Sequence, residues 1–173
     1  MKEPIDFRLS GDRVFSDRER AINRFYNKRY FGGEVVNGKL FLSLIEAAYL
    51  LEKGRIRVFD GEEELSFEDL VELGRKRDDQ FDIKLLVYTD LRDRGYTVKS
   101  ALKFGSHFRV YRRGMDEHSQ WLVWVVPENL RFSPPNDITA RVRVAHGVRK
   151  NMVMAVVDED NDVVYYKIEW VKF

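Results

Sequence analysis

Hydrophobic and polar positions follow two different periods along the 173 residues, and together they predict a series of short strands and helices. The first 42 residues carry short apolar runs separated by glycine-containing turns. Asn37-Gly38, which lies between two apolar runs, is a strong signal for a β-hairpin. The beginning of the chain is therefore predicted to form strands and turns.

Two helices with a strand between them are predicted next. Ser43 and Glu46 form a capping-box pattern at the start of the first helix, and Gly54 is a suitable C-terminal stop. Arg55–Phe59 is then predicted to form a strand, and Ser66 is expected to begin the second helix. These elements complete a small mixed α+β domain.

The polar sequence 78–80 is predicted to separate two domains, residues 1–79 and residues 80–173. The second domain is predicted to be a compact α/β domain with a central mixed sheet. Its predicted elements are a helix from Phe81 to about Gly95, two strands within Ser100–Val126 joined by a charged hairpin, a helix over Asp137–Arg149 with Asp137 as its N-cap, and two strands at Met152–Val157 and Val163–Val171.

Composition removes several classes of protein. The chain has no cysteine, which excludes disulfides, cysteine-ligated zinc and thiolate catalysis. No apolar run approaches the roughly 18 residues of a membrane-spanning helix, so no membrane partner is predicted. The first residues lack the apolar segment of a signal peptide. A cytoplasmic location is therefore expected.

Charge is balanced overall but is distributed unevenly. The net charge is +1, from 30 basic and 29 acidic residues. Between Lys99 and Val157 there are ten basic and four acidic residues, a net charge of +6, and the rest of the chain carries −5. Positive charge concentrated in one segment favours a polyanionic substrate.

Three side chains of this basic segment could together cleave RNA without a metal. Attack of a ribose 2′-hydroxyl on its own phosphate needs a base, an acid for the leaving 5′-oxygen and a cation for the phosphorane charge. Tyr111, His118 and Lys150 are the candidates for these roles. A phenol is a weak base because its free pKa is about 10, so a tyrosine base needs cations nearby. Strand alternation places Arg109 and Arg113 on the face of Tyr111, and both are candidate RNA contacts.

Each of these residues also has an ordinary structural explanation. A tyrosine at a strand end is often a packing residue, a histidine in a polar turn is usually solvated, and Lys150 could stabilise the C-terminus of a helix. His107 and His146 are interpreted as structural or auxiliary. Composition and spacing alone thus support a basic, metal-free domain that acts on RNA.

Metal-dependent alternatives have little support in the sequence. The three histidines form no HxxxH or HExxH pair. Asp82-Ile83-Lys84, with Asp78 or Asp79 upstream, matches the end of a metal-nuclease pattern, but it lies within a predicted helix. The acidic run 158–162 lacks the glycine and final glutamate of an EF-hand. No metal and no cofactor are predicted.

Several longer segments resemble the archaeal tRNA-splicing endonucleases, also called tRNA-intron endonucleases. They cover nearly the whole chain in the expected order: LSLIEAAYLLEKGRIRVFDG, LKFGSHFRVYRRG, HSQWLVWVV, RVAHGVRK and VVYYKIEW. The resemblance implies a two-domain enzyme that cuts precursor tRNA at both intron borders, within a bulge–helix–bulge fold. It implies a 2′,3′-cyclic phosphate and a 5′-hydroxyl as product ends, with no metal in the chemistry.

The same resemblance assigns residues. It implies that Tyr111 is the base, His118 the acid and Lys150 the charge stabiliser. It also implies that Arg143 and a second residue from a neighbouring subunit hold a flipped bulge base, and Trp170 stands at that second position, where arginine is usual. The implied assembly is a homotetramer, a dimer of dimers, in which an acidic turn docks on another subunit through Asp158, Asp160 and Asp162. The alternative function is a non-catalytic structural RNA-binding subunit of a heteromeric enzyme.

Overall fold

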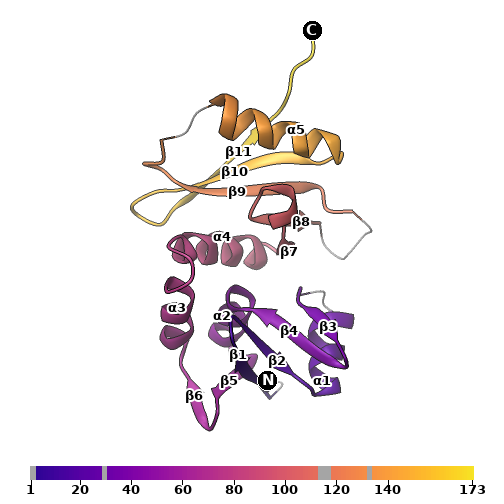
Figure 1. The fold of residues 1–173 in the computed structure, drawn as a ribbon, viewed down its shortest axis with the longest axis vertical. Helices are drawn as coiled ribbons and strands as arrows, with labels where there is room; N and C mark the ends of the chain where they lie inside the picture. The colour runs from indigo at the N-terminus through magenta and orange to yellow at the C-terminus, as the bar shows by residue number, and fades with distance from the viewer. Residues whose placement is uncertain (1–2, 29–30, 113–117, 132–133) are drawn as a thin grey trace. The chain divides into compact units, whose positions relative to one another are not determined.

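The computed structural model describes residues 3–28, 31–112, 118–131 and 134–173 of the chain (Figure 1). These residues form two compact units, residues 1–85 and residues 86–173, each with its own sheet. The arrangement confirms the predicted fold class, a mixed α+β unit followed by a unit with a central mixed sheet. The predicted domain boundary after residue 79 stays a prediction.

The N-terminal unit is built on a six-stranded sheet with the strand order β3-β4-β2-β1-β5-β6. Only β1 and β5 are parallel, so the sheet is mixed. Its elements are β1 (Ile5–Ser10), β2 (Arg13–Ser16), α1 (Glu19–Ala21), the π-helical turn η1 (Ile22–Asn27), β3 (Glu34–Val36), β4 (Lys39–Ser43), α2 (Leu44–Glu52), β5 (Ile56–Asp60), β6 (Glu63–Leu65) and α3 (Phe67–Arg75).

Local sequence signals fix the boundaries of this unit. Asn37 and Gly38 both have positive φ, 50° and 74°, which a tight hairpin between β3 and β4 requires. Ser43 and Glu46 form both hydrogen bonds of a capping box at the start of α2, and Ser66 with Asp69 does the same for α3. The predicted hairpin and both predicted helix starts are therefore confirmed.

One helical segment of this unit was not predicted. Glu19–Asn27 is helical, whereas the first 42 residues were expected to form strands and turns. Arg18 precedes the segment and makes no side-chain cap, so the usual start signal is missing. Tertiary packing supplies the stability instead, because Phe25 is completely buried and its ring lies 6.2 Å from that of Phe7 on β1.

The C-terminal unit is a five-stranded sheet with the order β11-β10-β9-β8-β7, covered by helices on both faces (Figure 1). β9 and β10 are parallel and the other pairs are antiparallel. The elements that begin or lie in this part of the chain are α4 (Phe81–Asp93), β7 (Thr97–Ser100), the 3₁₀ turn η2 (Leu102–Phe104), β8 (Phe108–Tyr111), β9 (Trp121–Pro127), the π-helical turn η3 (Pro134–Thr139), α5 (Ala140–Gly147), β10 (Asn151–Val157) and β11 (Val163–Ile168).

The central strand β9 is buried on both faces. On one face, Leu122 and Trp124 pack with Ala145 of α5 and Met152 of β10. On the other face, Phe108 of β8 contacts Tyr88 of α4, with ring centroids 5.9 Å apart. Cover on both faces explains why five consecutive β9 residues, 122–126, are buried without alternation.

Two predicted boundaries in this unit are wrong. Helical structure begins at Pro134, so Asp137 lies inside the helical segment and not at its N-cap. Proline suits the first turn of a helix because its fixed φ fits and its missing N–H needs no partner there. The last strand ends at Ile168 and not at Val171, because Ile168 pairs with Met152, close to where β10 begins.

Candidate active site at one end of the C-terminal sheet

Three adjacent strands bring the predicted catalytic residues to one end of the sheet. β8 and β9 pair antiparallel with Val110 opposite Trp121, so the end of β8 lies beside the start of β9. β9 and β10 pair in parallel with Trp121 opposite Asn151, so the start of β10 lies there too. Tyr111, His118 and Lys150 all lie at or next to these strand ends, and neighbouring strands are about 4.8 Å apart. All three residues are therefore attached to this end of the sheet.

Backbone hydrogen bonds extend the pairing beyond the strands themselves. The N–H of Gln120 donates to the carbonyl of Val110, and the N–H of Asn151 donates to the carbonyl of Gln120, each at 2.9 Å. Both bonds lie directly beside the predicted residues Tyr111 and Lys150. Gln120 therefore links the segment that carries His118 to β8 on one side and to β10 on the other.

Lys150 stands between α5 and β10, and its side chain reaches toward β9. Its Nζ atom donates a hydrogen bond of 2.9 Å to the carbonyl oxygen of Ser119, the residue after His118. Burial, and secondarily the positive charge of Arg109, lower the pKa of the Lys150 ammonium below its ordinary value of 10.5. Lys150 is thus a partly desolvated cation next to the histidine segment.

Tyr111 and His118 differ in their exposure. Tyr111 is the last residue of β8 and is 9% exposed, while His118 is exposed. Strand alternation puts Arg109 and Tyr111 on one face of β8, the face on which Leu122 and Met152 pack against α5. Tyr111 is thus largely enclosed at this end of the sheet, whereas His118 is open to solvent.

The predicted RNA-binding arginines have different positions. Arg109 is half-buried on β8, and the Nε atom of its guanidinium is buried. Arg143 is exposed on α5. Arg113 lies outside the described residues. The sequence showed Arg109 as one of several basic residues and did not indicate that its charge acts on Lys150.

Trp170 contacts a residue that sequence reasoning treated as structural or auxiliary. The indole is 58% exposed and follows β11, and its ring centroid lies 5.2 Å from that of His146 on α5. His146 is three residues after Arg143, so both lie on one side of the helix. This helical spacing is the signal that links His146 to the predicted RNA-binding pair Arg143 and Trp170.

His107 has a structural contact. Its Nδ1 atom accepts a hydrogen bond of 2.9 Å from the backbone N–H of Val125 on β9. The carboxylates of the metal-nuclease pattern are bound to cations instead: Asp82 to Arg75 and Asp78 to Lys84. Within residues 3–28, 31–112, 118–131 and 134–173, no three His, Asp or Glu side chains are grouped as metal ligands would be.

The acidic turn between β10 and β11 is ordered by its own first residue. The Oδ1 atom of Asp158 accepts hydrogen bonds from the backbone N–H groups of Asp160 and Asp162, at 3.0 and 2.9 Å. The side chains of Asp160 and Asp162 are exposed. The turn therefore presents two carboxylates on a fixed backbone.

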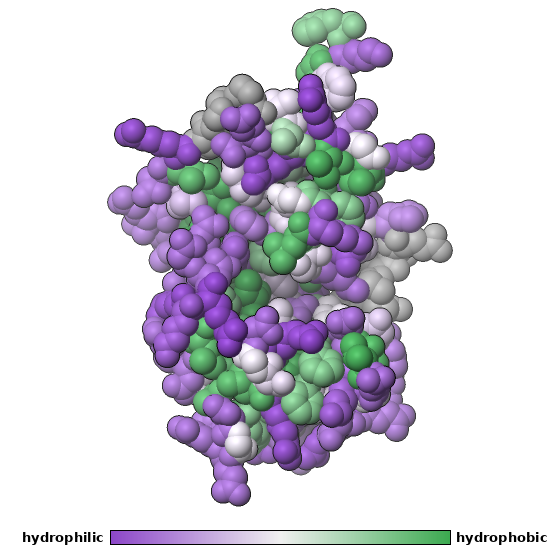
Figure 2. Space-filling view, in the orientation of Figure 1, coloured by the Kyte–Doolittle hydropathy of each residue, from purple (hydrophilic) through white to green (hydrophobic). Residues whose placement is uncertain are grey.

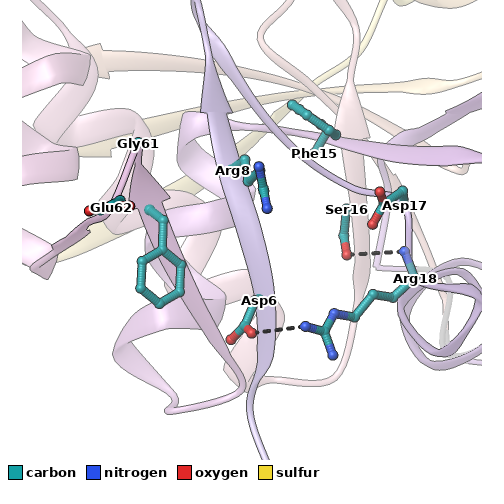
Figure 3. A pocket seen from close by; sticks show the side chains of 9 residues that line it. Asp6, Arg8, Phe15, Ser16, Asp17, Arg18, Gly61 and Glu62 are labelled. Carbon is teal, nitrogen blue, oxygen red and sulfur yellow. Dashed lines mark hydrogen bonds and ion pairs between the residues drawn. The ribbon is translucent and has the colours of Figure 1, made fainter.

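A separate cavity of about 390 Å³ lies in the N-terminal unit (Figure 3). Figure 3 shows Asp6 and Arg18 pointing toward each other across its floor, 3.2 Å apart, and Asp6 also binds Arg57. Its lining mixes acidic and basic side chains, among them Arg8, Asp17 and Glu62. This mixture does not favour a polyanion, unlike the basic end of the C-terminal sheet.

The basic sheet end and the preceding mixed unit define the class of protein: a two-domain α+β nuclease. Residues 81–165 match the family model described as tRNA intron endonuclease, catalytic C-terminal domain, and residues 5–71 match the corresponding N-terminal domain. The chain belongs to the tRNA intron endonuclease family. No helix among the described residues is long and apolar enough to cross a membrane.

Similar proteins extend over the whole chain. It is 86% identical to the tRNA-splicing endonuclease of Thermococcus onnurineus over 173 residues, covering all of both chains. It is 70% identical to that of Pyrococcus furiosus, again over the full length of both. The tRNA-splicing endonuclease of Methanococcus vannielii is 44% identical over 174 aligned positions, with 99% of this chain and 97% of that protein covered.

Proposed function

We propose that this enzyme cuts precursor tRNA at the intron–exon borders, within a bulge–helix–bulge fold, by metal-independent transesterification. The ribose 2′-oxygen forms a bond to phosphorus, and the bond from phosphorus to the 5′-oxygen breaks. The products carry a 2′,3′-cyclic phosphate and a 5′-hydroxyl. The observation that carries the proposal is the convergence of the ends of β8, β9 and β10, which bear Tyr111, His118 and Lys150.

Each of the three residues has one role in this reaction. Tyr111 takes the proton from the 2′-hydroxyl, and His118 gives a proton to the leaving 5′-oxygen. Lys150 stabilises the negative charge of the phosphorane, and its partial desolvation strengthens that interaction. Arg109 and Arg113 contribute positive charge along the path of the RNA.

RNA binding and assembly complete the proposal. Arg143 and Trp170 hold a bulge base by stacking, each from a different subunit of a homotetramer. Exposed apolar and aromatic residues gather on β11 and after it: Val164, Tyr166, Trp170, Val171 and Phe173. The surface view shows hydrophobic colour at the projecting C-terminal end (Figure 2). β11 is also an edge strand, so pairing with a second copy would cover both features.

The test uses the purified chain and a bulge–helix–bulge RNA in buffer that contains EDTA. We expect cleavage with cyclic-phosphate and 5′-hydroxyl ends. His118→Ala and Lys150→Ala should each lower the single-turnover rate by about 10²–10⁴-fold, and Lys76→Ala, at an exposed lysine of the N-terminal unit, should not. An RNA with a 2′-deoxyribose at the cut site should stay intact.

Three results would count against the proposal. Product strands with 3′-hydroxyl ends would exclude attack by the 2′-oxygen. Activity that EDTA removes and magnesium restores would favour a metal nuclease. Tight RNA binding by the wild-type chain without cleavage would favour the non-catalytic structural subunit.

A further inference from the structure

Arg109 has an unusual environment for an arginine. The Nε atom of its guanidinium is buried and has no hydrogen-bond partner within the described part of the chain. Burying a donor without a partner costs free energy, about 1–3 kcal/mol and more for a charged group. None of the ion pairs among the described residues joins Arg109 to a carboxylate.

Lys150 is a second cation beside it. The Lys150 ammonium donates to the neutral carbonyl of Ser119, and no ion pair of the described residues joins it to an acid either. Like charges placed together and partly desolvated destabilise a fold unless an anion binds between them.

We propose that Arg109 and Lys150 form a two-cation site for the scissile phosphate, in which the Arg109 guanidinium donates to the non-bridging phosphate oxygens. This inference rests on the proposed function and adds a residue to its catalytic site. Tyr111 is two residues from Arg109 on the same face of β8, so a phosphate bound there lies next to the phenol. The 2′-oxygen attached to that phosphate is then within reach of its base.

The planar guanidinium suits this position. Two parallel N–H groups can bind two phosphate oxygens at once, which fixes the orientation of the phosphorus atom. Lys150 acts as a point charge beside the histidine segment, while Arg109 lies two residue pairs further along the sheet, level with Leu122 and Met152. The two cations can therefore hold a phosphate at two points.

A first experiment measures anion binding and needs no RNA. Sulfate is titrated into the folded chain while the Nζ signal of Lys150 is followed by lysine-selective NMR. We expect Arg109→Gln to weaken binding at least tenfold and Arg109→Lys to give an intermediate loss. Arg131→Gln removes an exposed charge of the same basic segment and should change nothing. Equal sulfate affinity in the wild type and Arg109→Gln would overturn the proposal.

A second experiment measures cleavage. Arg109→Gln should lower the single-turnover rate by about 10²–10³-fold, which exceeds the roughly tenfold loss of affinity expected for an uncleavable 2′-deoxy RNA. The pKa of Lys150 should rise in the same variant, because a neighbouring positive charge is gone. Should Arg109→Gln not fold, Arg109→Lys serves, because it keeps the charge and loses the paired donors.

The two proposals fail in different ways. A wild-type chain that cuts no RNA overturns the proposed function, and the sulfate titration then decides the two-cation site alone. A wild-type chain that cuts RNA, together with an Arg109→Gln variant that cuts at the same rate, overturns only the two-cation site.

Discussion

The Nζ atom of Lys150 lies 2.9 Å from the carbonyl oxygen of Ser119 and donates a hydrogen bond to it. The contact spans 31 positions of the sequence and joins the start of β10 to the segment before β9. Burial of the ammonium, and secondarily the positive charge of Arg109, lower its pKa below 10.5.

This environment predicts a pH dependence of stability. Because the pKa of Lys150 is lower in the folded than in the unfolded chain, the unfolded chain holds more protons at pH values just below 10.5. The free energy of unfolding should therefore gain a contribution from Lys150 as the pH rises toward 10.5. Guanidinium unfolding of the wild type and Lys150→Met from pH 8 upward measures this contribution. If the free energy of unfolding depended on pH in the same way in both proteins, the prediction would be contradicted.

Tyr165 should make stability change with pH in the opposite direction to Lys150. Burial, and secondarily the hydrogen bond of 2.6 Å that its hydroxyl donates to Asp90, raise its pKa well above the ordinary value of 10.0. Above pH 10 the unfolded chain loses this proton first, so the wild type should lose stability there. Tyr165→Phe should remove that loss and cost about 0.5–1.5 kcal/mol at neutral pH. Tyr26→Phe, in the N-terminal unit, is the control; a wild-type-like alkaline decline in Tyr165→Phe would refute the assignment.

Local patterns were enough to predict much of the fold. The Asn37-Gly38 hairpin and the capping box of Ser43 depend only on neighbours in sequence, and the structure contains both. The helix at residues 19–27 was missed because its support comes from Phe7, more than ten residues earlier in the chain. The strand after residue 162 was predicted too long because its end depends on where its partner β10 begins.

For the candidate site too, some features could be predicted from the sequence and others only from the folded chain. The residue types and the local +6 charge indicated an RNA-directed site, and resemblance supplied the roles of Tyr111, His118 and Lys150. The pairing of β8, β9 and β10 is non-local, and no period in the sequence encodes that their ends meet. The unpartnered Nε of Arg109 and the packing of His146 on Trp170 are likewise visible only once the chain is folded.

The contact between His146 and Trp170 leads to a prediction about RNA binding. Aromatic stacking contributes about 1–3 kcal/mol per base, so Trp170→Ala should weaken binding of an uncleavable bulge–helix–bulge RNA by roughly 5–150-fold. Trp170→Phe should retain most of the affinity, and His146→Ala should give a smaller loss by freeing the indole. Val36→Ala, at an exposed apolar residue of the N-terminal unit, is the control in a fluorescence-anisotropy titration. Unchanged affinity in Trp170→Ala would exclude Trp170 from the RNA contact.

The acidic turn gives a prediction about assembly. Asp160→Asn together with Asp162→Asn removes two exposed charges and leaves Asp158, whose Oδ1 holds the turn, in place. If the turn docks on a basic surface of another copy, this double variant should dissociate the proposed tetramer into dimers, and more readily as salt is added. Light scattering measures the mass. Glu62→Gln with Glu63→Gln removes the same charge from exposed positions at the start of β6 in the N-terminal unit and should leave the mass unchanged. A tetramer that persists in the turn variant at high salt would mean that the turn is a solvated hairpin tip and that the subunits associate through other surfaces.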